Sequence, residues 1–215
     1  MKKIISISLI LLTIINFAFA QQDPKAQEIL NGVSAKYKTY KSVKSTYTLK
    51  VQDAADAQKD SQSGTLYVSA SKFKVEMTNQ DIVCNGTTIW TYAKSDNEVT
   101  IDDYTPDANS ITPSQIFTIW EKDFKYQFIE EKVDGAKTVQ VIDLTPNDSK
   151  KTYFKVRLTI DKVNKTLVSA KIFDKNQNKY TYTVGVFTAN PVLADTFFNF
   201  DTTKYPGIVI TDNRE

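Results

Sequence analysis

The chain has 215 residues, with 27 Lys and Arg against 25 Asp and Glu, so its formal net charge is only +2. A balance this close to neutral argues against nucleic-acid binding and against strong electrostatic docking on anionic lipid. The sequence contains no His, which removes the commonest general base and metal ligand and the Ser-His-Asp arrangement.

The first twenty residues have the features of a secretory signal peptide. A positive start and an apolar run precede an A-x-A cleavage site at residues 18–20. A lipoprotein signal would need a Cys directly after this site, where Gln21 stands. No later apolar run approaches the roughly 18 residues of a transmembrane helix. We therefore expect residues 1–20 to be removed and residues 21–215 to form a single soluble domain outside the cytoplasm.

A helix is predicted over about residues 24–40. Asp23 is a favourable N-cap, and Pro24 suits the first helical position. Apolar residues then recur at helical spacing and share one face: Ala26, Ile29, Leu30, Val33, Tyr37 and Tyr40.

From Val43 the apolar period changes to two, which predicts a half-buried strand that contains Tyr47, Leu49 and Val51. Residues 53–62 are small, polar and charged, so a loop is expected there. The stretch from residue 64 to 77 reads as two strands with a short break near residues 69–71.

The segment DIVCNGTTIWTY, residues 81–92, holds the only Cys of the chain. Asn-Gly favours a type I′ turn, which predicts a tight hairpin with Cys84 opposite Thr87 and Ile82 opposite Ile89. Val83, Trp90 and Tyr92 then point to the other face. A redox Cys would want a second Cys or a basic setting, so we interpret Cys84 as a plain strand residue. One Cys also cannot form an internal disulfide.

Thr112-Pro113-Ser114-Gln115 forms a capping box and predicts a short helix that interrupts the strands. Its apolar residues are Ile116, Phe117, Ile119 and Trp120, followed by Phe124. Strands then resume in meander order, with a two-residue turn at Asp134-Gly135 and late strands near residues 153–160, 167–173 and 179–187. This spacing is typical of an antiparallel barrel or curved sheet.

One face of a single antiparallel sheet must be covered. Two amphipathic helices are available, and a curved sheet with helices across its hollow would enclose an apolar cavity under a lid. A simpler interpretation is that these apolar residues only form a packed core. A cavity lined by Tyr, Phe, Trp and Met would suit acyl chains, because each buried CH₂ contributes roughly 0.8 kcal/mol.

Several segments together resemble the periplasmic lipoprotein carriers of the LolA type. GTLYVSASKFKVEM resembles that family's G-x-L-W-V…F-x-W-x-M segment, and ITPSQIF its T-P-x-x-L/F helix. DIVCNGTTIWTY resembles its I-V-S-D-G-K-T-L-W-x-Y hairpin, in which Cys84 replaces a Ser. FKVRLTIDKVNKTLVSAKIFDKNQNKYTY resembles its paired late strands. FFNFDTTKYPGIVITDNRE resembles its ending, F-x-F-x-P-P-x-G-V-x-V-x-D.

The resemblance implies a mainly β fold, an unclosed antiparallel half-barrel with a short helical lid. It implies a monomeric carrier without cofactor or metal, which receives acylated lipoproteins from an inner-membrane lipoprotein-releasing transporter and delivers them to an outer-membrane acceptor. The family often has an Arg after the G-x-L-W-V strand that latches the lid. Here that region reads Ser69-Ala70-Ser71-Lys72, so Lys72 is the candidate latch, although it lacks the rigid fork of Arg.

The alternation of apolar residues in the strands predicts which side chains form the cavity wall, and the apolar faces of the two helices predict which form the lid. The expected wall residues are Tyr47, Leu49, Phe73, Val75, Met77, Trp90, Tyr92, Phe154, Val156 and Leu158. The expected lid residues are Ile29, Leu30, Val33, Ile116, Phe117 and Trp120.

Two other classes of function stay open at this point. A related half-barrel could sense lipoproteins, or carry another lipid, rather than transport lipoproteins. An enzyme is disfavoured, because adjacent carboxylates such as Asp102-Asp103 and Glu130-Glu131 point to opposite faces of a strand and are typical of solvated surface.

Overall fold

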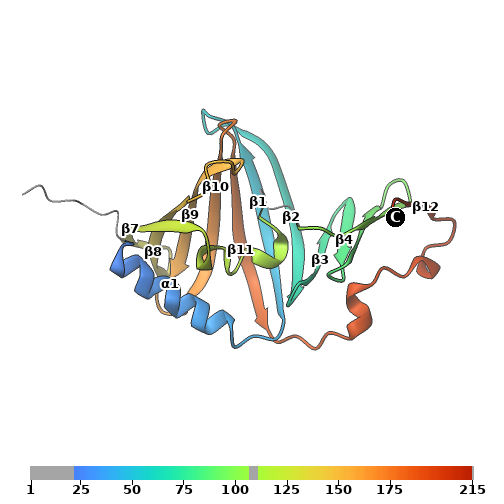
Figure 1. The fold of residues 1–215 in the computed structure, drawn as a ribbon, viewed down its shortest axis with the longest axis horizontal. Helices are drawn as coiled ribbons and strands as arrows, with labels where there is room; N and C mark the ends of the chain where they lie inside the picture. Colours follow the sequence, from blue (N-terminus) through green and yellow to red (C-terminus); the bar gives the residue numbers. More distant parts are fainter. Residues whose placement is uncertain (1–21, 107–110, 215) are drawn as a thin grey trace, which may run out of the picture.

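The computed structural model describes residues 22–106 and 111–214, so the expected signal peptide lies outside the described residues. One sheet of twelve strands runs in the order β12-β6-β5-β4-β3-β2-β1-β11-β10-β9-β8-β7 and curves without closing, since β12 and β7 remain its two edges (Figure 1). Every pair is antiparallel except β12 with β6. The predicted fold class, a mainly β unclosed half-barrel with a short helical cover, is confirmed.

The elements have these bounds: α1 Pro24–Tyr37, β1 Val43–Gln52, β2 Gln58–Ser69, β3 Lys72–Met77, β4 Gln80–Cys84, β5 Thr88–Ala93, β6 Glu98–Asp103, η1 Pro113–Gln115, η2 Ile119–Glu121, β7 Phe124–Asp134, β8 Lys137–Pro146, β9 Tyr153–Asp161, β10 Thr166–Asp174, β11 Lys179–Ala189, η3 Asp195–Phe198, η4 Thr202–Lys204 and β12 Val209–Asp212.

Helix α1 begins as its sequence predicts. The Asp23 carboxylate accepts hydrogen bonds from the Lys25 and Ala26 amides at 2.9 and 3.2 Å. The helix ends at Tyr37 rather than near residue 40, and a tighter turn follows, in which the Tyr40 amide donates to the Tyr37 carbonyl. Its buried face packs beneath the concave side of β7 to β10 (Figure 1).

The expected loop at residues 53–62 is too long. Strand β2 already starts at Gln58, and the Asp53 carboxylate closes a short turn by accepting hydrogen bonds from the Ala55 and Ala57 amides. Residues 58–63 are polar because this end of the β1–β2 hairpin is exposed, so their sequence resembles a loop although they pair with β1. The predicted break between β2 and β3 is confirmed.

The hairpin of β4 and β5 forms, but its turn differs from the prediction. Cys84 lies opposite Ile89 rather than Thr87, and three residues form the loop. The Asn85 side chain accepts hydrogen bonds from the Thr87 and Thr88 amides, and Gly86 takes the positive φ of 97°. The partners shift by two residues, so side chains that were predicted to share a face of the hairpin still share one. The predicted two-residue turn after β7 forms, but one residue later than expected: Gly135 and Ala136 are its loop residues, and Asp134 lies opposite Lys137.

Bulges reverse the alternation of two late strands. In β9, Lys155 pairs with Phe173 and Tyr153 with Asp174, so Phe154 is an extra residue. Phe154 therefore points outward and is 50% exposed, while Tyr153 is buried. A second bulge in β11 turns Val186 outward and brings Phe187 into the core in its place.

Two short 3₁₀ turns, η1 and η2, replace the predicted short helix after Thr112. The predicted capping contact is present, since the Thr112 amide donates to the Gln115 side chain at 3.3 Å. The following Ile-Phe-Thr-Ile-Trp run is β-branched and aromatic, which disfavours a regular helix. Phe117 and Trp120 of this segment are nevertheless buried.

The C-terminal segment runs from the end of β11 along the lower side of the sheet in Figure 1 before β12 pairs with β6. Phe197 packs on Tyr67 of β2 with 4.8 Å between ring centroids. Farther along, Phe200 and Tyr205 cover Tyr92, with centroids 5.2 and 4.5 Å from it. A second apolar cluster thus forms on the face opposite the lid.

Candidate functional site

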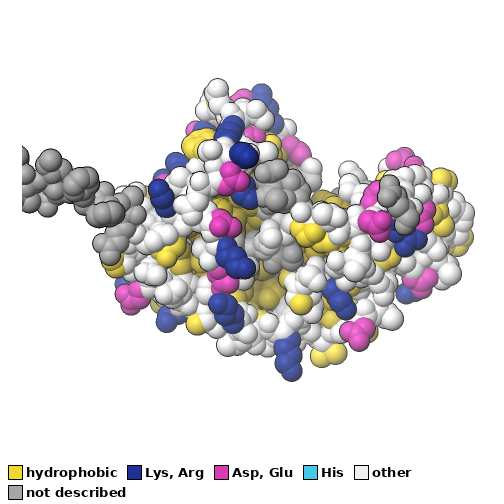
Figure 2. All heavy atoms as spheres, viewed as in Figure 1, with side chains coloured by type: hydrophobic (Ala, Val, Ile, Leu, Met, Phe, Trp, Pro, Cys, Tyr) yellow, Lys and Arg dark blue, Asp and Glu magenta, His cyan; other side chains and the backbone are white. Residues whose placement is uncertain are grey.

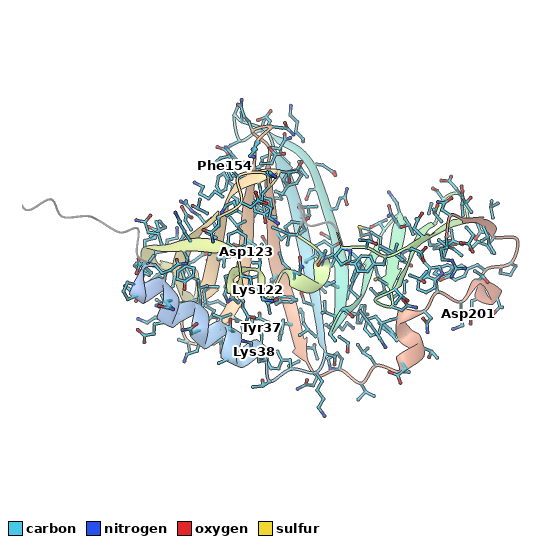
Figure 3. The ribbon with its side chains drawn as sticks, in the orientation of Figure 1. Tyr37, Lys38, Lys122, Asp123, Phe154 and Asp201 are labelled. Atoms are coloured by element: carbon cyan, nitrogen blue, oxygen red, sulfur yellow. The ribbon has the colours of Figure 1, made fainter. Side chains whose placement is uncertain are left out.

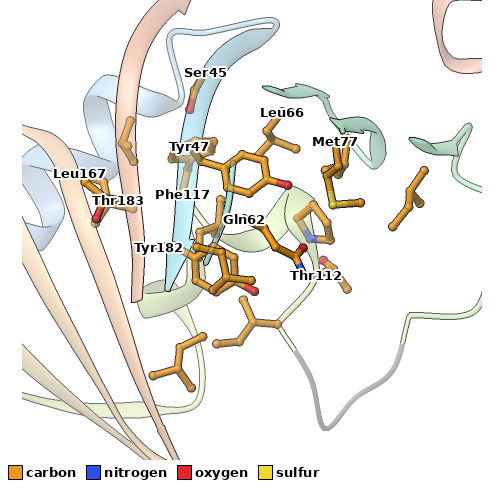
Figure 4. Close-up of a pocket in the computed structure, with 18 residues that line it drawn as sticks. Ser45, Tyr47, Gln62, Leu66, Met77, Thr112, Phe117, Leu167, Tyr182 and Thr183 are labelled. Carbon is orange, nitrogen blue, oxygen red and sulfur yellow. The ribbon is translucent and has the colours of Figure 1, made fainter. Parts of the chain in front are cut away.

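An apolar cavity of about 220 Å³ lies between the concave face of the sheet and residues 111–117, which we call the lid segment (Figure 4). The lining residues are Ser45, Tyr47, Leu49, Gln62, Leu66, Val75, Met77, Ile82, Ile111, Thr112, Pro113, Ile116, Phe117, Leu167, Ile172, Tyr182, Thr183 and Val184. None of these residues carries a charge. Figure 2 shows apolar side chains in the hollowed centre of this face, while charges of both signs are scattered around it.

Strand β1 places two wall residues at the centre of the cavity. Tyr47 lies opposite Val184 of β11, and Leu49 lies opposite Tyr182. On the other side of β1, Tyr47 faces Gly64 of β2. A Cβ at Gly64 would meet the Tyr47 hydroxyl at 2.9 Å and the Glu76 carbonyl at 2.4 Å, so only Gly leaves room for this ring.

Stacked aromatic rings close the deep end of the cavity. Phe117 of the lid segment stacks on Tyr37 of α1, with centroids 5.1 Å apart and planes 18° apart. Phe187 of β11 meets both rings edge-on, at 5.8 Å from Tyr37 and 6.1 Å from Phe117. Burial raises the pKa of Tyr37 to about 12, and its hydroxyl accepts a hydrogen bond from the Leu167 amide at 3.3 Å.

A buried hydrogen bond ties the region after the lid segment to α1. The Trp120 indole N–H donates to the Ser34 hydroxyl at 2.7 Å, and both residues are buried. Lys72 was the candidate latch, but it lies next to Phe73, whose side chain faces the core, so alternation directs Lys72 to the convex face. Within residues 22–106 and 111–214, no hydrogen bond or ion pair joins the Lys72 ammonium to another side chain.

Six predicted site residues line the cavity: Tyr47, Leu49, Val75, Met77, Ile116 and Phe117. Six others belong to the same core cluster without lining it: Leu30, Val33, Phe73, Trp120, Val156 and Leu158. Ile29 packs against this cluster from α1.

The predicted positions of Trp90, Tyr92 and Phe154 on the concave face are wrong. Trp90 pairs with Val83, and both Trp90 and Tyr92 belong to the second cluster beneath the C-terminal segment. The bulge in β9 turns Phe154 outward, and Figure 3 shows it at the far end of the strands from Tyr37.

The prediction also missed wall residues on β2, β4, β10 and β11. The missed wall residues include Leu66, Ile82, Leu167, Ile172, Tyr182 and Val184. Tyr182 and Val184 could have been found from the sequence, because they alternate within one strand as Tyr47 and Leu49 do. Leu167 and Ile172 could not, because Val168 is an extra residue in β10 and places odd- and even-numbered positions of this strand on the same face.

Two structural observations bear on other classes of function. In the part of the chain that the structure describes, no helix has the length and apolar character needed to cross a membrane. Among the same residues, no three Asp, Glu or Cys side chains come together as a metal site.

The sequence matches a family model over residues 38–201, described as "Outer membrane lipoprotein carrier protein LolA". This match covers the cavity wall, the lid segment and most of the sheet. A search of curated proteins found no significant match to this sequence.

Solved structures resemble this chain at low sequence identity. An uncharacterized conserved protein from Thermus thermophilus superposes with a TM-score of 0.54 and 14% identity, covering 88% of this chain and 99% of its own. LprF from Mycobacterium bovis gives a TM-score of 0.49 and 15% identity, with 80% and 96% covered. A LolA superfamily protein from Nitrosomonas europaea gives 0.42 and 14%, with 81% and 97% covered.

Proposed function

We propose that this chain, which belongs to the outer membrane lipoprotein carrier protein (LolA) family, binds the acyl chains of lipoproteins in the cavity beneath its lid segment. The observation that carries the proposal is an uncharged cavity whose cover is a short segment rather than a long packed helix. Such a cavity removes acyl CH₂ groups from water, which stabilises the bound state by roughly 0.8 kcal/mol for each group.

Cargo loading requires the lid segment to move. The cavity of about 220 Å³ is smaller than the roughly 300–1,000 Å³ of pockets that hold drug-sized ligands. Acyl chains therefore enter by replacing lid contacts, first among them the stacking of Phe117 on Tyr37. The free energy of the lost stacking is offset by new contacts between Tyr37, Phe187 and the chains.

The proposed route follows from the family and from the expected signal peptide. The protein is exported to the periplasm, receives acylated lipoproteins from an inner-membrane transporter and passes them to an outer-membrane acceptor. It binds without covalent chemistry. Release then requires a partner that binds the cargo more tightly, or that binds the open carrier preferentially.

Mass spectrometry of the mature protein purified from its own periplasm tests the proposal, both in the native state and after solvent extraction. We expect a co-purifying triacylated lipoprotein. Free lipid in its place would keep the site and assign it another lipid cargo. A protein that is persistently empty, and that also takes up no lipopeptide in vitro, would contradict the proposal and favour a sensor of the same fold.

A matched pair of variants on β11 connects cargo retention to the cavity. Val184 lines the cavity, whereas Val186 is 72% exposed on the same strand. We expect Val184→Glu to lose cargo, because a carboxylate in the cavity would be desolvated by acyl chains. Val186→Glu should retain cargo. Circular dichroism checks that both variants fold, and equal retention by the two variants would contradict the cavity assignment.

A further inference from the structure

Two tyrosine side chains, those of Tyr47 and Tyr182, line the uncharged cavity. Tyr47 and Tyr182 lie on neighbouring strands, with ring centroids 6.5 Å apart and planes 45° apart. Within the described part of the chain, neither hydroxyl hydrogen-bonds to another protein group. Both rings are half-buried, and burial raises the pKa of each, so both hydroxyls stay protonated and can donate at neutral pH.

The cavity becomes more polar along its length. At the deep end, the aromatic rings of Tyr37, Phe117 and Phe187 pack together. Tyr47 lies in the middle. Two residues farther along β1, Leu49 has Tyr182 on one side and the exposed Gln62 on the other, so these three residues form one row across the sheet. Figure 4 shows the side chains of Tyr47, Tyr182 and Gln62 in the same part of the cavity.

Gln62 sits at the open end of this row. Its amide group donates to the Asp60 carboxylate at 2.7 Å, which turns the polar end of the row toward the exposed tip of the β1–β2 hairpin. An amphiphile that enters along this direction places its chains against the aromatic rings and its polar group near the strand tips. Its first polar atoms beyond the chains then lie near the two phenols.

We infer that Tyr47 and Tyr182 form a hydrogen-bonding subsite for the ester carbonyls that join acyl chains to the polar part of a lipidated molecule. The inference rests on the proposed function and adds an orientation for the cargo. A phenol suits this position, because its ring contributes apolar wall and its hydroxyl donates to a carbonyl acceptor. The carbonyl in turn gains a partner that it would otherwise lose on leaving water.

Binding of two synthetic probes tests this subsite. One is a lipopeptide with two ester-linked palmitoyl chains and one amide-linked chain, and the other carries ether-linked alkyl chains in place of the esters. We expect the wild-type protein to prefer the ester probe by roughly three- to tenfold for each hydroxyl that donates. The Tyr47→Phe/Tyr182→Phe double variant should bind both probes as weakly as the wild type binds the ether probe.

Tyr180→Phe is the matched control, since it removes a hydroxyl from the same strand outside the cavity lining. It should keep the wild-type preference for esters. Equal binding of ester and ether probes by the wild type would overturn the subsite and leave the carrier proposal intact. The subsite would also be overturned if the Tyr47→Phe/Tyr182→Phe variant lost affinity for both probes by the same factor. A wild type that binds neither probe would overturn the carrier proposal as well.

A diacyl phosphatidylglycerol probe separates the two sources of such carbonyls. A loss of affinity in the double variant similar to that for the lipopeptide supports recognition of the acyl ester itself. Loss for the phospholipid alone, with the lipopeptide unaffected, overturns the assignment for lipoprotein cargo.

Discussion

Cys84 shows how burial decides the chemistry of a single residue. Its side chain is fully buried in the core, opposite Phe73 and Ile89, and the Gly86 amide donates to its sulfur at 3.4 Å. Burial raises the pKa of the thiol, so little reactive thiolate exists at neutral pH. The interpretation of Cys84 as a plain strand residue agrees with this environment.

We therefore expect Cys84 in the native protein to resist a thiol-reactive dye at pH 7 and to react fully once urea unfolds the chain. Absorbance of the released dye product measures the rate in each state. Rapid labelling of the native protein, at a rate near that of a free peptide thiol, would show that the β4–β5 hairpin opens readily.

Trp120 and Ser34 form a buried hydrogen bond that the sequence did not predict. Trp120→Phe keeps most of the ring but removes the N–H that donates to Ser34. We expect the free energy of unfolding to fall by about 1–2 kcal/mol, because a buried hydroxyl loses its partner. Bound lipid should also exchange faster. Urea denaturation and a fluorescent-lipid release assay measure the two effects.

Ser34→Ala provides the second arm of a double-mutant cycle with Trp120→Phe. If the hydrogen bond is the shared interaction, the double variant should be destabilised by less than the sum of the two single variants. Strict additivity would indicate that the two residues act independently, and it would contradict a role for this hydrogen bond in holding the segment at Trp120 against α1.

At the scale of elements, the start of α1 also protects a sheet edge. β7 is an edge strand, and unpaired edges invite association with other chains. Gln22 covers it by accepting from the Tyr126 amide at 3.0 Å and donating to the Phe124 carbonyl at 2.8 Å. The Asp23 carboxylate accepts from the Phe128 amide at 2.8 Å while it caps the helix.

The Asp23 carboxylate should make stability depend on pH. The hydrogen bond from the Phe128 amide, together with those from Ala26 and Lys25, lowers the pKa of Asp23. A depressed pKa in the folded state contributes stability above the unfolded value of about 3.9, and this contribution is lost as the pH falls through the folded value. We expect Asp23→Asn to be less stable than the wild type at pH 7, with the difference shrinking below about pH 4.

Urea denaturation of both proteins between pH 7 and pH 2.5 measures this difference. The asparagine side chain keeps one acceptor oxygen for the helix cap but loses the second oxygen, which accepts from the Phe128 amide, so only the pH-dependent part of the difference reports the charge. A stability difference that stays constant across the series would mean that the charge of Asp23 does not contribute.

At the scale of the molecule, the residues that the structure describes form two apolar clusters on opposite faces of one sheet. The larger contains the cavity, and the smaller joins Tyr92, Val99 and Ile101 to the C-terminal segment. Tyr205 stacks with Phe200 at 4.8 Å and lies 4.5 Å from Tyr92. Because the clusters lie on different faces, the C-terminal segment can contribute to stability without touching the cavity.

We accordingly expect Tyr205→Ala to lower the free energy of unfolding by about 1–3 kcal/mol through lost apolar burial, while lipid retention at 25 °C stays at the wild-type level. Thermal denaturation and lipid extraction from the same preparation measure both. Loss of lipid from a variant that remains folded would show that the two faces are coupled through the sheet.

Local patterns in the sequence determined the β-rich class, the N-cap of α1, the hairpin near Asp134-Gly135 and the break between β2 and β3. Each depends on the conformational preferences of neighbouring residues, which a few positions of sequence display. The same period of two assigned Tyr47, Leu49, Val75 and Met77 correctly to the cavity face. These strands are regular between the residues concerned, so alternation held along them.

The tertiary structure decided which faces are wall, core or surface in the rest of the molecule. An extra residue opposite a partner strand reverses the alternation, so Phe154 turned outward for a reason that its own strand sequence does not contain. Trp90 and Tyr92 are buried by Phe200 and Tyr205, residues more than a hundred positions later in the chain. The Trp120–Ser34 hydrogen bond likewise joins residues 86 positions apart. Periodicity reports only local geometry, whereas burial depends on which distant segment packs against each face.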